Sequence, residues 1–352
     1  MSSRMVNVPT PSTQIRVLSR RYTRDSRSRP PYDDRSEEGS NPSCYPLWAK
    51  LSNGKDGDGI VMASSPSPPT LPETISLSES GLKATISDDR FVPGSLLLTI
   101  GATPQSHLNI GHPDVLQFEY IRRIGHVIDL ITTPTTPLTA LHLGGGALTL
   151  PRYLETTRPG SRQQVIEWEP DLIDLVRRHA PWESSWSIRV RYGDARHMLD
   201  RLPAGLQESC DLIVVDLFAG DHTPAHLTST EFYEATLRYL KPTGTLAVNI
   251  VDGPGQHFAR SQWATLSALC GFVGVVGEAS IVRGRRLGNL VTIGRLEQQE
   301  PQWWPELSRL GPHPSATLSG TKLAHLISGH APVTDQTATP SPRLGKGFIS
   351  GP

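Results

Sequence analysis

The chain has 352 residues, enough for one large domain or two modest ones, and 37% of them are hydrophobic. Its 34 lysines and arginines balance its 34 acidic residues, so the charge provides no strong field that would attract nucleic acid. The three cysteines lie at no metal-ligand spacing, and no apolar run approaches the length of a membrane span. We therefore expect a cytoplasmic protein that binds no nucleic acid, no membrane and no metal.

The N-terminal part of the chain is predicted to be a disordered extension over residues 1–70. It is rich in Arg, Ser, Gly and Pro and shows no apolar periodicity. Foldable sequence begins soon after Met62, and we hypothesise that translation starts there rather than at Met1.

A small N-terminal β domain is predicted over residues 71–112. Alternation with period two over 74–78 is followed by strand-like segments over 82–86 and 95–100, with turn residues between the last two. This pattern indicates a small antiparallel β unit.

The main domain is predicted over residues 113–296. A helix is expected from Pro113 to about Ile131, because isoleucines recur along it at three- and four-residue spacing. Strands and helices then alternate; the predicted strands cover 139–143, 164–167, 188–191, 211–216, 245–250, 272–276 and 289–293. This order predicts an α/β fold, a Rossmann-like doubly wound parallel sheet preceded by the small antiparallel β unit.

A C-terminal extension is predicted over residues 297–352. It includes a possible short helix near 318–327 and is expected to be partly disordered, with loose chain after Asp335. The default expectation for Trp303 and Trp304 is packing over the sheet edge.

Three features at predicted strand ends point to an adenosine-type ligand. Gly144, Gly145 and Gly146 follow the first strand of the main domain, and glycines there let backbone N–H groups approach a ligand closely. Glu167 ends the next strand and can accept hydrogen bonds from ribose hydroxyls, while Asp194 ends the third and can accept from an adenine amino group. Each feature alone has a structural explanation, such as a tight turn, a surface carboxylate or a helix cap. Their order at successive strand ends favours ligand binding.

A fourth feature is Asp216, which ends an apolar strand. A carboxylate at the mouth of a half-dry pocket can orient an amine or accept its proton, although it can also serve only as a loop cap. The long loop 217–227 that follows is expected to lie over the pocket, which favours a functional role.

Further motifs extend this pattern along the chain. They are Leu98-Thr99-Ile100-Gly101 with Gln105, Val165-Ile166-Glu167-Trp168-Glu169, Gly193-Asp194-Ala195, Thr223-Pro224-Ala225-His226-Leu227, Glu231-Phe232-Tyr233 and Leu240-Lys241-Pro242-Thr243-Gly244. With these motifs the chain resembles the polyamine aminopropyltransferases, the spermidine synthase family, from about Leu77 to Arg295.

The resemblance implies a scaffold like that of class I S-adenosylmethionine-dependent methyltransferases, and a reaction that moves an aminopropyl group from decarboxylated S-adenosylmethionine to an amine. It assigns the proton-accepting role to Asp216, the ribose to Glu167, the adenine to Asp194 and Ala195, and the thioether region to Gln105. It also implies a homodimer paired through the N-terminal β unit.

The chain departs from the family pattern where cationic groups are usually held. Ala147 stands where an acid usually follows the glycine run, and Ala219 stands where a second acid usually follows the catalytic one. The family's Tyr followed by His or Gln is matched here to Phe118-Glu119. Because an unpaired buried cation is costly, substrate affinity should fall unless Glu119 or Asp221 compensates.

Three functions remain open from the sequence. The first is an aminopropyltransferase with altered amine specificity. The second is an S-adenosylmethionine-dependent methyltransferase, since the loss of the acid at Ala147 removes a charge that would repel the carboxylate of the intact cofactor. The third is a catalytically silent nucleoside-binding module, against which the presence of Asp216 argues.

Overall fold

The computed structural model describes residues 70–343. The predictions made for residues 1–69, among them the disordered extension and the start at Met62, lie outside the described residues. Residues 344–352 lie outside them as well. Within residues 70–343, no helix is long and apolar enough to cross a membrane.

The chain begins with an antiparallel sheet in which each strand pairs with the next. Its strands are β1 (Glu73–Ser76), β2 (Lys83–Asp88), β3 (Ser95–Ile100) and β4 (Thr103–Asn109). The prediction of an antiparallel unit is confirmed, but β4 was not predicted. Polar residues and Pro104 give β4 no apolar alternation, and its pairing with β3 shifts register between Leu98 and Thr99.

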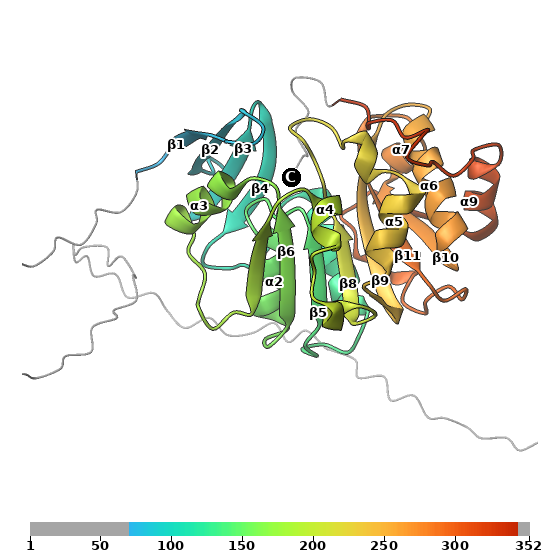
Figure 1. Cartoon of the computed structure of the whole chain (residues 1–352), viewed down its shortest axis with the longest axis horizontal. Helices are drawn as coiled ribbons and strands as arrows, with labels where there is room; N and C mark the ends of the chain where they lie inside the picture. Colours follow the sequence, from blue (N-terminus) through green and yellow to red (C-terminus); the bar gives the residue numbers. More distant parts are fainter. Residues whose placement is uncertain (1–69, 344–352) are drawn as a thin grey trace, which may run out of the picture. The chain divides into compact units, whose positions relative to one another are not determined.

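A second sheet of eight strands follows, in the order β12-β10-β11-β9-β8-β5-β6-β7 (Figure 1). Its strands are β5 (Thr139–Leu143), β6 (Arg162–Glu167), β7 (Ile188–Tyr192), β8 (Cys210–Val215), β9 (Leu240–Asp252), β10 (Phe272–Glu278), β11 (Gly288–Arg295) and β12 (Ser315–Ser319). The five strands from β7 to β9 pair in parallel, which confirms the Rossmann-like class.

The other end of this sheet is antiparallel, so the doubly wound sheet is mixed and mainly parallel. There β11 pairs antiparallel with both β9 and β10, and β12 pairs antiparallel with β10. Residues 279–287, which join β10 to β11, are too few for the crossover that a parallel neighbour requires. The two strands therefore form an antiparallel pair.

The helices are α1 (Glu119–Leu130), α2 (Thr149–Thr157), α3 (Pro170–His179), α4 (Ala195–Leu199), α5 (Thr230–Leu237), α6 (His257–Leu269), α7 (Ala279–Val282), α8 (Glu306–Leu310) and α9 (Gly320–Ile327). The helix expected from Pro113 begins only at Glu119. Its N-cap residue, Phe118, is extended with ψ 136° and is buried, so the chain enters the helix from an extended segment packed on the core.

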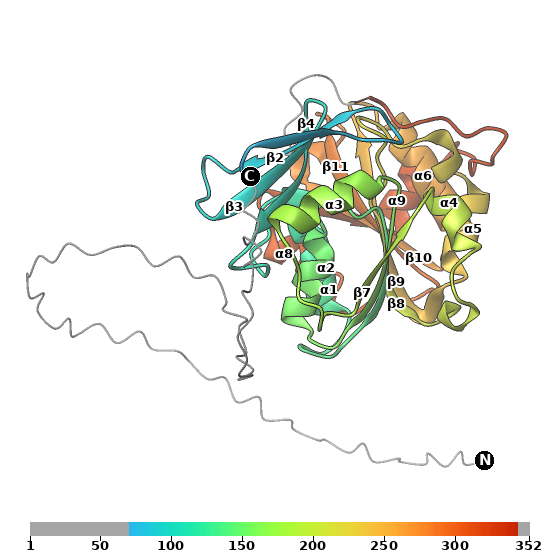
Figure 2. The ribbon, with the colours of Figure 1, turned by 60° about the vertical axis from the view of Figure 1, so that its left-hand side comes forward.

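Helices cover both faces of the large sheet. One apolar cluster joins α1 and α2 to alternate residues of β5, β8 and β11, and the other joins α4, α5, α6 and α9 to the opposite residues of the same sheet. A third cluster packs β2, β3 and β4 of the small sheet against α3, as Figure 2 shows. Helix α3, which follows β6 in the chain, also packs on β6 through Ile173 and Val165.

The C-terminal segment is more ordered than expected. Trp304 is 3% exposed and packs edge-on against Phe272, over Gly274 of β10, where a side chain would collide with the indole ring. It therefore packs on the face of the sheet and not over its edge. The expectation of loose chain after Asp335 is wrong for residues 335–343, because Asp335 bonds to Arg196 of α4 and Ser341 bonds to Thr223 in the loop after β8. Periodicity gave no signal for either contact, because Trp304 and residues 335–343 themselves lie outside the helices and strands.

Candidate functional site

A cavity lies at the carboxyl ends of β5, β6 and β8, where an open α/β sheet places its ligands. Residues of β4, the start of α1 and the loop over 217–227 complete its walls. Eight residues predicted for the site line this cavity: Gln105, Gly144, Gly145, Gly146, Glu167, Asp194, Ala195 and Asp216. The tertiary structure thus brings together residues that lie more than a hundred positions apart.

The glycine run makes the close approach that its composition suggested. Gly144 has φ +92°, and a Cβ there would lie 2.1 Å from the backbone oxygen of Asp216. Gly146 has φ +50°, and a Cβ there would collide with the side chain of Ser106. Glycine is needed at both positions, and Gly144 lets the loop after β5 pack directly on the residue that follows β8.

Glu167 ties this loop to the end of β6. Its Oε2 accepts hydrogen bonds from the backbone N–H groups of Gly145 (2.8 Å) and Gly146 (3.1 Å), and its Oε1 accepts from the N–H of Glu169 (3.0 Å). Burial raises the pKa of Glu167, and these backbone hydrogen bonds oppose the rise. The carboxylate can accept further hydrogen bonds from hydroxyl groups of a ligand, because each oxygen has two lone pairs.

Asp194 caps α4 at the next strand end. Its Oδ1 accepts from the backbone N–H of His197 (3.1 Å), and its Oδ2 accepts from Nε2 of His226 (2.8 Å). Burial alone would raise the pKa of Asp194, but the hydrogen bonds from His226 and His197 outweigh it and leave the pKa lowered. Asp194 is therefore ionised at neutral pH, beside Ala195 in the cavity wall.

Asp216 receives two side-chain hydrogen bonds at the end of β8. Asn249 of β9 donates to Oδ1 (2.8 Å), and the hydroxyl of Tyr120 donates to Oδ2 (3.2 Å). Burial raises the pKa of Asp216 above its ordinary value, and both hydrogen bonds act against that rise. The carboxylate is held in one orientation and can accept a proton from a ligand.

Tyr120 is a cavity residue that the sequence analysis did not identify, since the family's tyrosine was matched to Phe118. Tyr120 lies in the first turn of α1, is 8% exposed and lines the cavity. Burial first, and the charge of Asp216 second, hold the pKa of Tyr120 well above 10. Its hydroxyl therefore remains a hydrogen-bond donor. The sequence shows only a tyrosine within the predicted helix, and the fold shows that this tyrosine faces Asp216.

His142 also lines the cavity and was not predicted. It belongs to β5, is 1% exposed, and donates from Nε2 to Oε1 of Gln163 (3.1 Å). Burial lowers the pKa of His142 to about 4, so the imidazole is neutral at neutral pH. It therefore adds no positive charge to the cavity.

Glu119 and Asp221, predicted as substitutes for the missing acids, are not brought to the cavity. Glu119 accepts hydrogen bonds from Nε and Nη2 of the buried Arg123. It does not line the cavity, although the next residue, Tyr120, does. Asp221 accepts from Nη1 of Arg343 (2.8 Å) and contacts His222. Each carboxylate is neutralised by an arginine of this chain.

Of the two alanines noted in the sequence, only Ala219 is a cavity-lining residue, and Ala147 is a core residue directly after the glycine loop. Ala147 is fully buried, and its backbone N–H donates to Oγ of Ser106 (3.1 Å), while Ala219 lines the cavity. Among residues 70–343 no cluster of His, Cys, Asp or Glu could hold a metal ion. The polar groups that line the cavity include carboxylates, the phenol of Tyr120, the imidazoles of His142 and His226 and the amide of Gln105.

Comparisons with known proteins place this geometry in context. No protein-family model matches the chain. It is 31% identical to the polyamine aminopropyltransferase of Vibrio vulnificus over 135 residues, which cover 38% of this chain and 44% of that protein. It is 26% identical to the polyamine aminopropyltransferase of Neisseria meningitidis serogroup A over 159 residues, which cover 44% of this chain and 57% of that protein. The chain thus spans about half the length of these relatives.

Two further similarities extend the comparison. The crystal structure of a probable spermidine synthase from Corynebacterium glutamicum superposes with a TM-score of 0.68 at 26% identity, over 76% of this chain and 97% of that one. An eEF1A lysine and N-terminal methyltransferase of Danio rerio is 23% identical over 130 residues, which cover 35% of this chain and 19% of that protein.

Proposed function

We propose that this chain, a distant homologue of the polyamine aminopropyltransferases, transfers an aminopropyl group from decarboxylated S-adenosylmethionine to an amine. The observation that carries the proposal is that Tyr120 and Asn249 both donate hydrogen bonds to the buried Asp216. Asp216 lines the same cavity as Glu167 and Asp194. A nucleoside-binding module would not need a buried carboxylate oriented by two donors.

In this proposal the nucleoside is held by the strand ends. Glu167 accepts from the ribose hydroxyls, and Asp194 with Ala195 contacts the adenine. The loop of Gly144, Gly145 and Gly146 lies beside the ribose. Gln105 lies near the sulfur, although its amide already donates to the backbone oxygen of Gly220 (3.0 Å).

The reaction is an in-line displacement at the carbon next to the sulfonium. The lone pair of the amine forms the new C–N bond, the C–S bond breaks, and the electron pair returns to sulfur to give the neutral thioether nucleoside. The attacking amine must be unprotonated or lose a proton, and Asp216 accepts that proton. The sulfonium is already a good leaving group, so positioning of the two partners supplies most of the rate enhancement.

The acceptor should carry less charge than a diamine. Four carboxylates line the cavity, those of Glu167, Glu169, Asp194 and Asp216. Glu169 accepts from the backbone N–H groups of Glu79 and Ser80, and Asp194 is paired with His226. Ala147 and Ala219 stand at the two positions where the family usually has acids. Asp216 is therefore the carboxylate that is left to receive a cationic amine. We therefore propose an amine with one cationic centre and a neutral remainder.

The test is calorimetric binding of the purified protein to decarboxylated S-adenosylmethionine and, separately, to S-adenosylmethionine. We expect tighter binding of the decarboxylated form. Glu167→Ala should weaken binding of both by about tenfold or more, because it removes the ribose acceptor and loosens the glycine loop. Asp174→Asn, on the exposed side of α3, is the matched control and should bind as the unaltered protein does.

Tighter binding of the intact cofactor would contradict aminopropyl transfer and favour methyl transfer. The buried alanine at 147 favours this second function, because no acid stands there to repel the carboxylate of S-adenosylmethionine. The similarity to a Danio rerio methyltransferase supports the same alternative. Binding of neither compound would leave a catalytically silent module.

We further propose that two copies pair through the small sheet and that the enzyme acts in the cytoplasm. The small sheet carries two exposed apolar side chains, those of Phe91 (92% exposed) after β2 and Ile110 (48% exposed) after β4. Exposed apolar groups on one unit support a protein contact there.

A further inference from the structure

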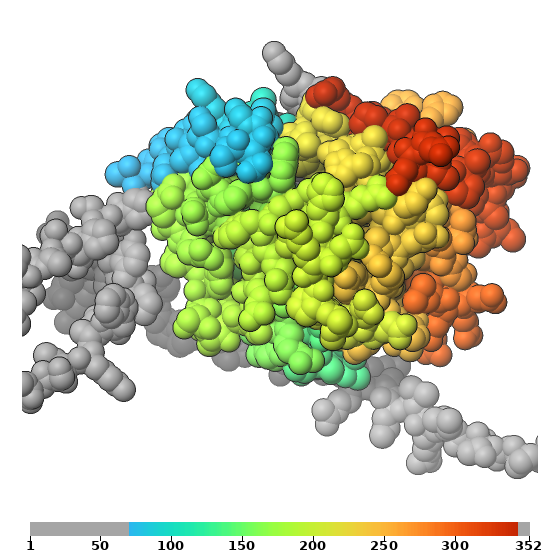
Figure 3. Space-filling model, viewed as in Figure 1, coloured from blue at the N-terminus to red at the C-terminus, as the bar shows by residue number. Residues whose placement is uncertain are grey.

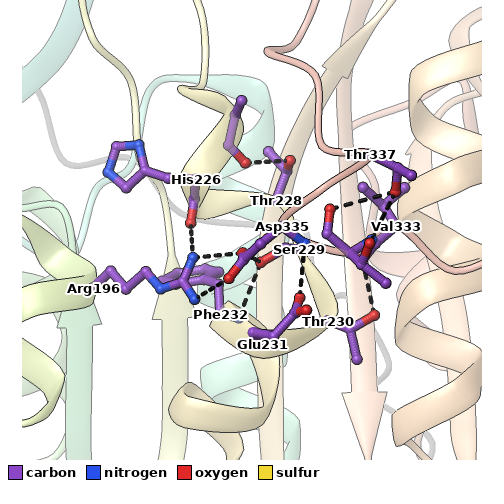
Figure 4. Close-up of polar contacts among 12 residues, drawn as sticks. Arg196, His226, Thr228, Ser229, Thr230, Glu231, Phe232, Val333, Asp335 and Thr337 are labelled. Carbon is purple, nitrogen blue, oxygen red and sulfur yellow. Dashed lines mark hydrogen bonds and ion pairs between the residues drawn. The ribbon is translucent and has the colours of Figure 1, made fainter.

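The loop that covers the cavity is held by a segment from the far end of the chain. We call residues 217–227 the covering loop and residues 333–343 the C-terminal strap. Figure 3 shows the red strap lying directly against the yellow covering loop, and Figure 4 shows the polar contacts at their centre. Seven residues of the covering loop line the cavity: Leu217, Phe218, Ala219, Gly220, Pro224, His226 and Leu227.

The far end of the strap bonds directly to the covering loop. The backbone N–H of Ser341 donates to the oxygen of Thr223 (3.0 Å), and the N–H of Thr223 donates to Oγ of Ser341 (2.8 Å). Arg343 donates to Asp221 in the turn of the loop. These reciprocal bonds fix the middle of the covering loop to the strap.

Asp335 joins the strap to α4 and α5 (Figure 4). It accepts two parallel hydrogen bonds from Arg196, at 2.6 and 2.7 Å, and a third from the hydroxyl of Ser229 at 2.5 Å. Ser229 is the N-cap of α5, and the backbone N–H of Asp335 donates to Glu231 in the first turn of that helix. The hydrogen bonds from Arg196 and Ser229 lower the pKa of Asp335 to about 2, so it is ionised at neutral pH.

Arg196 connects Asp335 to α4 and to the covering loop, both of which contribute residues to the cavity wall. It belongs to α4, whose N-cap is Asp194, and its Nη1 also donates to the backbone oxygen of His226 (3.1 Å) in the covering loop. The side chain of His226 in turn donates to Asp194. On the opposite side, Gln105 of β4 donates to Gly220 of the loop. The covering loop is therefore held by Gln105, by the strap directly, and by Arg196, whose side chain is bound by Asp335 of the strap.

We propose that Arg196 and Asp335 are positioning residues that act through the covering loop to set the affinity of the cavity for its nucleoside. Neither side chain contacts the reacting groups. The ion pair of Arg196 with Asp335 keeps His226 and Asp194 in the positions that bind the adenine. Because the covering loop is already ordered, the nucleoside does not lose binding free energy by ordering it. The part of this inference that concerns affinity rests on the proposed function, whereas the part that concerns the loop does not.

The test uses the full chain with Asp335→Asn and Arg196→Gln, singly and together. Hydrogen exchange should become about tenfold faster in the covering loop, while exchange in α3 stays unchanged. The dissociation constant of 5′-methylthioadenosine should rise about fivefold to tenfold. The donor KM should rise with it, while kcat changes little.

Two comparisons separate positioning from general destabilisation. The double variant should bind the nucleoside no more weakly than Arg196→Gln alone, because both changes break the Arg196–Asp335 pair and only Arg196→Gln also removes the bond to His226. Asp335→Glu keeps the charge and should recover most of the affinity. The control is Asp200→Asn, which breaks the exposed Arg238–Asp200 pair (2.9 Å) near the same helices and should change neither exchange in the loop nor affinity.

Unchanged exchange in the covering loop of Asp335→Asn would overturn the proposal. Faster exchange with unchanged affinity for 5′-methylthioadenosine would overturn its claim about the nucleoside. If the unaltered protein does not bind 5′-methylthioadenosine, the proposed function fails, and exchange in the covering loop still decides whether the strap holds it.

Discussion

Asp216 combines two properties that a purely structural carboxylate would not need together. Burial raises its pKa, so the fold tolerates its charge at some cost, and yet Tyr120 and Asn249 donate to it and hold it in one orientation. A group whose pKa is raised by folding contributes stability that is fully present below its unfolded pKa and is lost as the pH rises through the folded pKa. At neutral pH the ionised form therefore brings no stability.

Asp216→Asn should accordingly separate activity from stability. We expect the turnover of an amine acceptor to fall about a hundredfold or more, while the affinity for the donor nucleoside changes little. The free energy of unfolding at pH 7 should stay the same or increase, because the variant removes a buried charge. Steady-state kinetics and denaturant unfolding on the same preparation measure both.

The pH dependence of kcat/KM is a second test of the role of Asp216. Because the pKa of Asp216 is raised, the ionised base is lost at a higher pH than for an ordinary aspartate, and kcat/KM should fall as the pH decreases through that value. Full turnover in Asp216→Asn would show that another group accepts the proton.

At the scale of elements, the loop between β5 and α2 decides where Asp216 stands. Gly144 meets the backbone oxygen of Asp216 in a conformation that other residues rarely adopt. Position 144 is therefore predicted to tolerate no side chain, for reasons of both space and backbone strain.

Gly144→Ala should lower the free energy of unfolding by about 2–4 kcal/mol, since the added Cβ meets backbone atoms that cannot yield easily. Gly205→Ala is the matched control, because its Cβ would meet nothing within 4 Å and its φ is not positive. Denaturant unfolding of both variants measures the difference. Equal stability of the two variants would contradict the close approach at Gly144.

The elements also show where sequence patterns succeed and fail. Strand β5 and helix α3 have the predicted bounds, because an apolar run bounded by turn residues and an amphipathic stripe starting at a proline are both local signals. Strands β4 and β12 were missed, because polar residues and a proline interrupt the pattern in β4, and the alternation in β12 is limited to Ala316 and Leu318 in a strand of five residues. Their pairing with neighbours decides their conformation.

At the scale of the whole molecule, the proposed pairing through the small sheet is open to measurement. Light scattering of the purified full chain should give the mass of two copies. Phe91→Ser should shift the protein toward one copy, because it removes an apolar side chain that is 92% exposed in the single chain. Leu310→Ser, at an exposed apolar residue at the end of α8, is the control and should leave the mass unchanged. A mass of one copy for the unaltered chain would contradict the pairing.

The sequence by itself determined the class of fold and the order of the glycine run, Glu167, Asp194 and Asp216 along it. These follow from local periodicity and from the rule that parallel strands end at one edge of a sheet, so residues at successive strand ends converge. The same rule was sufficient to place the cavity.

Only the tertiary structure decided which other side chains reach that cavity. It turned Tyr120 toward Asp216, joined Glu119 and Asp221 to arginines away from the cavity, and set β11 antiparallel beside β9. It also brought Asp335 to Arg196 across 139 positions of the chain. The direction of a side chain and a contact between distant segments depend on packing against neighbours that the local pattern of residues does not specify.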